Sequence, residues 1–106
     1  MVMVYRADIR DNHLNGMKIK QIDLLLDGLR REYGYETHQS IEFLADHGMM
    51  LYDIKGHFGV VRVIDREWVR YFVMGNLVND NAFKKLEDKF EELGVLRASE
   101  HKRVAF

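Results

Sequence analysis

The residues best suited to chemistry gather in the middle of the chain, around three expected turns. Four acids, one lysine and two histidines lie there: Asp46, His47, Asp53, Lys55, His57, Asp65 and Glu67. Side chains from neighbouring hairpin ends can converge, and carboxylates brought together hold a metal ion or share a proton. The simpler interpretation, which we favour, is that these are solvated charges at the ends of hairpins.

One part of this group has a familiar layout. Asp53-Ile54-Lys55 ends an expected strand, with Asp46 or Glu42 upstream and a helix before it, and so resembles the PD-(D/E)xK nucleases over residues 18 to 64. The resemblance implies that Asp46 and Asp53 hold a divalent cation that activates water, while Lys55 stabilises charge on phosphate. The same acid-x-lysine spacing recurs at 87–89 and 100–102, where no such site is expected. A metal-dependent nuclease is therefore the alternative hypothesis.

The segment 55–63 has a second resemblance. Its Lys-Gly-His-Phe-Gly-Val-Val-Arg-Val sequence is similar to the RNP1 strand of RNA-recognition motifs, whose aromatic side chains stack on bases. Val60 and Val63 stand where stacking rings are needed, which leaves only Phe58. The favoured interpretation is a glycine turn that leads into a buried strand.

Aromatic residues and arginines are interleaved between residues 62 and 72. The set is Arg62, Arg66, Trp68, Arg70, Tyr71 and Phe72. Such surfaces bind single-stranded nucleic acid or form the centres of protein interfaces. Because the net charge is only −1, a protein partner is favoured over nucleic acid.

Asp23 and Asp27 form a pair of carboxylates one helical turn apart. That spacing suits a metal or a shared proton, but Lys20, Arg30 and Arg31 lie nearby on the same expected helix. We therefore expect a solvated helix face with weak ion pairs. The five histidines have no His-x-x-x-His spacing, and no metal or other cofactor is predicted.

Length and composition predict a single domain over residues 1–106. About half of the chain is apolar (47%) and about a third is charged (31%), which is the balance of a globular protein. The chain has no cysteine, so thiolate chemistry and disulfides are excluded. An early charge at Arg6 interrupts any signal-peptide core, and no apolar run is long enough to span a bilayer. We expect a cytoplasmic protein without a membrane partner.

Hydrophobic periodicity predicts the elements in order. Strands are expected at 2–10, 35–45, 49–54, 58–64 and 67–74, helices from about 17 to 33 and from about 81 to 93, and a last edge strand at 95–96 and 104–106. The stretch 35–45 also suits a short helix capped by Ser40. A glycine follows each expected helix, at Gly34 and Gly94, where it can adopt the left-handed conformation that ends a helix.

This order predicts an α+β fold in which an antiparallel β-meander carries two amphipathic helices on one face. The plan is that of a ferredoxin-like split βαβ unit with an added hairpin. Strands 58–64 and 67–74 are apolar on both faces, so the face without helices is expected to be an interface. Its predicted residues are Val61, Val63, Val69, Tyr71 and Val73. The sequence therefore favours a non-enzymatic interaction or regulatory module that forms a homo-oligomer or binds a protein partner.

Overall fold

The computed structural model describes residues 2–34, 48–95 and 97–104. Within these ranges it has five strands and two α-helices: β1 (Val2–Arg10), α1 (Gly16–Tyr33), β2 (Met49–Ile54), β3 (Phe58–Asp65), β4 (Trp68–Gly75), α3 (Asn81–Glu92) and β5 (Arg97–Val104). A short 3-10 helix, His13–Asn15, precedes α1. The predicted α+β class is therefore confirmed.

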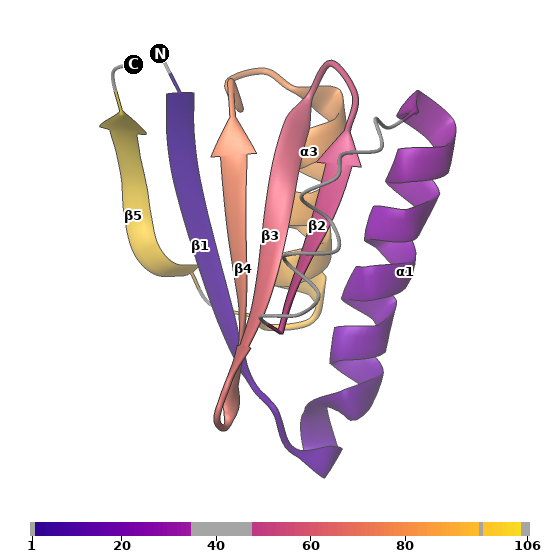
Figure 1. The fold of residues 1–106 in the computed structure, drawn as a ribbon, viewed down its shortest axis with the longest axis vertical. Helices are drawn as coiled ribbons and strands as arrows, with labels where there is room; N and C mark the ends of the chain where they lie inside the picture. The colour runs from indigo at the N-terminus through magenta and orange to yellow at the C-terminus, as the bar shows by residue number, and fades with distance from the viewer. Residues whose placement is uncertain (1, 35–47, 96, 105–106) are drawn as a thin grey trace.

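The strands form one antiparallel sheet with the order β2-β3-β4-β1-β5. Figure 1 views the sheet from the side away from the helices: α3 lies behind the strands, and α1 lies along the β2 side. The described strands that come before and after α1, β1 and β2, are separated by β4 and β3 and run antiparallel to each other. A split βαβ unit connects parallel strands, so the ferredoxin-like plan is not confirmed.

The core lies between the helices and one face of the sheet. In β1 to β4 the residues that point there alternate with those of the other face, and ten of them are buried. The register places these residues side by side across neighbouring strands. They are Tyr5, Ala7, Ile9, Tyr52, Ile54, Phe58, Val60, Val69, Tyr71 and Val73. Aromatic rings fill the space under α3: Tyr5 stacks with Phe90 at 5.9 Å between ring centroids and meets Phe83 edge-on at 5.4 Å.

Both helices bury the stripes that their periodicity predicts. α1 buries Ile22, Leu26 and Leu29, and α3 buries four residues that include Phe83 and Phe90. Gly34 ends α1 with a φ of 93°, and its N–H donates to the Arg30 carbonyl at 2.8 Å. No helix in the described part of the chain is long and apolar enough to cross a membrane.

Two predicted boundaries differ from the structure. The turn between β3 and β4 is Arg66-Glu67, one residue later than predicted, because Asp65 still pairs with Trp68. The last strand, β5, starts at Arg97. Its sequence is mostly polar, as is usual for an edge strand, and therefore lacks the alternation of apolar residues that predicts a strand. The predicted strand 35–45 lies outside the described residues.

Gly28 lies in the middle of α1, where we expect alanine to be more stable. A Cβ atom at this position would meet nothing within 4 Å, so close approach to the sheet does not explain the glycine. Gly28→Ala should raise the free energy of unfolding by about 0.5–1 kcal/mol, because alanine loses less backbone entropy in a helix. Urea unfolding measures this change.

The matched control for Gly28 is Gly16, the first residue of the same helix, which also has open space around it. Gly16→Ala should give a smaller gain, since helix propensity counts least at the terminus. A loss of stability in Gly28→Ala would show that the position is not an ordinary helix interior.

Candidate interaction face

The side of the sheet away from the helices, here called the open face, carries a block of apolar side chains. Its members are Val4, Met49, Leu51, Val61, Val63, Phe72 and Met74. The register aligns Leu51, Val61 and Phe72 across three neighbouring strands. All seven are at least partly exposed, and Met74 is 41% exposed. Within the described residues no helix packs on this face.

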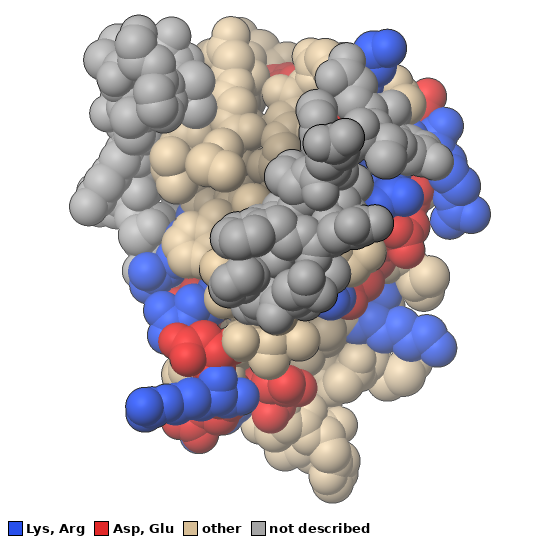
Figure 2. Space-filling model, viewed as in Figure 1, with Lys and Arg blue, Asp and Glu red and all other residues tan. Residues whose placement is uncertain are grey.

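Charged side chains form a second part of the open face, across β1, the end of β3 and the start of β4. Arg6 contacts Asp8 at 3.4 Å, and Arg70 contacts Asp65 at 3.9 Å. Figure 2 shows acidic and basic residues side by side at the lower left of this face, with uncharged residues above them. The two signs are intermixed, so this part of the face favours neither an anionic nor a cationic partner.

Arg10 and Trp68 lie at one end of the charged part, where the last residue of β1 pairs with the first residue of β4. The guanidinium of Arg10 lies 5.1 Å from the centroid of the Trp68 ring and donates to Glu67 at 3.3 Å. A cation over an aromatic face is attracted to the ring, and the contact also holds the indole in place. Trp68 is thus already engaged within the chain.

The predicted interface residues fall on opposite faces of the sheet. Val61 and Val63 lie on the open face, but Val69, Tyr71 and Val73 are buried under the helices at 2%, 0% and 0% exposure. The prediction was wrong for these three residues. A two-residue turn pairs odd-numbered positions of β3 with even-numbered positions of β4, so Val61 shares its face with Phe72.

The residues of the nuclease hypothesis are not brought together by the described structure. Asp46 lies outside the described residues. Asp53 lies between the buried Tyr52 and Ile54 and therefore points to the open face, whereas the side chain of Lys55 lies against Gly34 at the end of α1. Among the described residues no group of three or more acids and histidines is placed to hold a metal ion.

Asp23 is not on a solvated helix face, contrary to the sequence-based expectation. Its carboxylate accepts from Arg62 of β3 at 2.7 Å and from the Tyr71 hydroxyl at 3.1 Å. Burial raises the pKa of Asp23, and the charge of Arg62 partly opposes that rise. The pKa of Tyr71 is also raised, first by burial of the Tyr71 hydroxyl and then by the negative charge of Asp23. This cluster ties the middle of α1 to the sheet.

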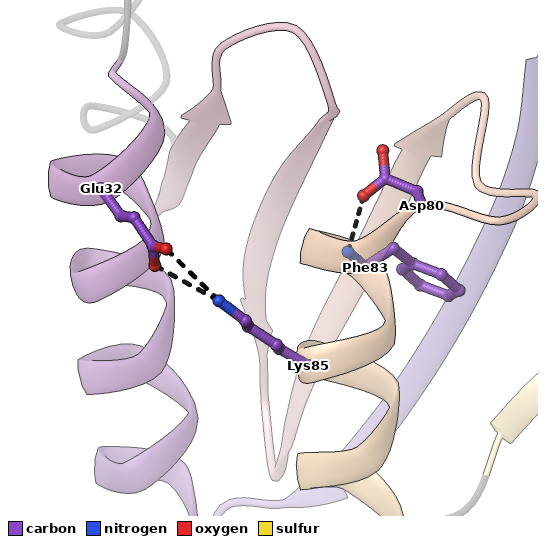
Figure 3. Close-up of polar contacts among 4 residues, drawn as sticks. All are labelled: Glu32, Asp80, Phe83 and Lys85. Atoms are coloured by element: carbon purple, nitrogen blue, oxygen red, sulfur yellow. Dashed lines mark hydrogen bonds and ion pairs between the residues drawn. The ribbon is translucent and has the colours of Figure 1, made fainter.

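Polar contacts also connect α3 to the turn between β2 and β3 and to α1. The Asp80 side chain accepts from the Phe83 N–H at 2.9 Å and so caps α3, and it contacts His57 Nδ1 at 2.9 Å. Lys85 of α3 donates to Glu32 of α1 at 3.4 Å (Figure 3). The sequence alone did not predict these pairs, because residues that are far apart in the chain leave no periodic signal.

A hollow of about 410 Å³ lies at the start of α3. Met3, Leu77 and Phe83 form its apolar part, while Lys84 and Glu87 bring opposite charges to its lining. That mixture indicates no particular ligand charge. The open face is the better candidate for function because its apolar block extends across three neighbouring strands and onto β1.

Comparison with known proteins does not assign the chain to a family. No family model, no curated protein and no solved structure matches the chain. The class that the fold defines is an α+β protein with an antiparallel sheet and two helices on one face.

Proposed function

We propose that this chain is a cytoplasmic protein-interaction module that associates with a second copy of itself through the open face. The observation that supports this most is the apolar block that includes Phe72, on a face that neither α1 nor α3 covers. Exposed apolar surface of this kind is typical of protein interfaces. The other versions of this proposal are a module that binds a different protein and a module with a regulatory role.

Self-association fits the charges of the face as well as its apolar block. A two-fold axis brings the same patch of both copies together, so the patch must complement itself. The charged part carries arginines and acids in close pairs, such as Arg6 with Asp8 and Arg70 with Asp65. Two such parts can meet with opposite signs opposed, and the net charge of −1 provides little repulsion.

The experiment that tests this proposal places a charge in the apolar block. Phe72→Glu should weaken self-association by at least about tenfold, because a carboxylate would have to be buried without a partner. Sedimentation equilibrium measures the change, and circular dichroism checks the fold. Lys84→Glu is the control, since Lys84 is highly exposed on α3 and lies off the open face. Equal association of the wild type and Phe72→Glu would refute the proposal.

The alternative prediction of a metal-dependent nuclease gains no support from the described residues. Asp53 and Lys55 point to different parts of the surface, and no other observation favours phosphate chemistry there. The interaction module is therefore the function that we propose.

A further inference from the structure

The outward side of α1 carries two exposed apolar side chains, Met17 and Leu24, separate from the open face. Its stripe consists of Met17, Gln21, Leu24, Gly28 and Arg31, which follow one another at steps of three and four residues. Met17 is 66% exposed and Leu24 is 55% exposed. Such spacing places the five residues on one side of the helix, opposite the buried Ile22, Leu26 and Leu29.

Gly28 is the least expected member of this outer stripe. Glycine is among the poorest residues for a helix interior, and neither its backbone conformation nor a close neighbour within the chain requires it. Positions where a sequence departs from local preference without an internal reason are often functional. A missing side chain between Leu24 and Arg31 leaves a shallow space on the outside of the helix.

We propose that α1 pairs with α1 of a second copy, antiparallel and about a two-fold axis between Gln21 and Leu24. The pairing seats Met17 of each chain in the space over Gly28 of the other. Closer to the two-fold axis, Leu24 of each chain lies against Gln21 of the other. The three- and four-residue spacing of the stripe is the repeat by which two helices interlock along a seam.

The charges beside the stripe select the antiparallel orientation. Lys20 and Asp27 lie on the same flank of α1, seven residues apart. In the antiparallel pair Lys20 faces Asp27 of the second copy, and the two-fold axis repeats this contact. In a parallel pair the flank that carries Lys20 and Asp27 would face the opposite flank of the second copy, so this contact between opposite charges would not form.

This contact is independent of the open face because it uses the other side of the molecule. A substitution that disrupts one of the two contacts should leave association through the other contact. The experiment is therefore carried out in the Phe72→Glu background as well as in the otherwise unchanged chain, so that the two proposals succeed or fail separately.

Disulfide trapping tests the pairing directly, because the chain contains no cysteine. The double variant Met17→Cys/Gly28→Cys should form covalent dimers on mild oxidation. The two positions are about 16 Å apart along one helix, too far to bridge within a chain. Met17→Cys and Gly28→Cys alone are the controls, since in the antiparallel pair each residue lies equally far from its own copy.

We expect at least ten times more covalent dimer from the double variant than from either single variant. Equal yields from the double and single variants would overturn the proposal. A charge exchange gives a second readout that requires no oxidation: Lys20→Glu should weaken association severalfold, and Lys20→Glu/Asp27→Lys should restore it. A double charge variant that associates no better than Lys20→Glu would also overturn it.

Discussion

Phe90→Ala is expected to lower the free energy of unfolding by about 3–5 kcal/mol. Phe90 is 1% exposed on the inner side of α3, stacks with Tyr5 and lies 5.9 Å from the ring centroid of Tyr71. Its removal takes apolar surface out of the core and leaves a cavity between α3 and the central strands. A loss of this size is a large part of the stability of a small domain.

Phe72→Ala provides the matched control, since it removes the same side chain from the open face. Phe72 is partly exposed, so the cost to folding should be much smaller, and the main effect should be weaker association. Denaturant unfolding at low protein concentration separates the two variants. A cost below about 1 kcal/mol for Phe90→Ala would mean that α3 does not cover the sheet as described.

The second large effect is a loss of stability at alkaline pH that depends on Tyr52. Burial, together with the nearby negative charge of Asp23, raises the pKa of Tyr52 from 10.0 to about 12. The unfolded chain releases this proton near pH 10, whereas the folded chain keeps it until about pH 12. Between these values the unfolded state binds fewer protons, so stability falls as the pH rises.

The raised pKa of Tyr52 should remove about 2–3 kcal/mol of stability between pH 10 and pH 12, and Tyr71 acts in the same direction. In Tyr52→Phe this loss should be smaller by that amount, because phenylalanine has no proton to release. Urea unfolding at several pH values, with each variant compared with its own stability at pH 7, measures the difference. An unchanged alkaline loss in Tyr52→Phe would show that the hydroxyl is not buried.

Sequence patterns predict the helices and most strands because burial on one face leaves a periodic signal. The stripe of α1 was found in this way, although Leu25 is only partly buried while Leu26 is fully buried. β5 left no such signal, since its residues are mostly polar. Sheet order is a long-range property, which explains why the neighbours of β1 could not be read from periodicity.

The existence of an uncovered sheet face was predictable from the sequence, but its residues were only partly identified. The two-faced apolar pattern of β3 and β4 indicated an uncovered sheet face, but the choice of residues required the register between the strands. Any two-residue turn pairs odd positions with even ones, so the error at Val69, Tyr71 and Val73 was avoidable from the sequence. The contact of Asp23 with Arg62 joins residues far apart in the chain, so no local sequence pattern predicts it.

The measurement that tests the central claim most directly is an isotope-filtered NMR experiment on a mixture of carbon-13-labelled and unlabelled chains. It detects only proton pairs that lie close together in different copies. If the open face is the interface, the Phe72 ring of one copy should show contacts to the methyl groups of Val61, Val63 or Leu51 of another. The absence of such contacts in an associated sample, or contacts that involve only Met17 and Leu24 of α1, would contradict association through the open face.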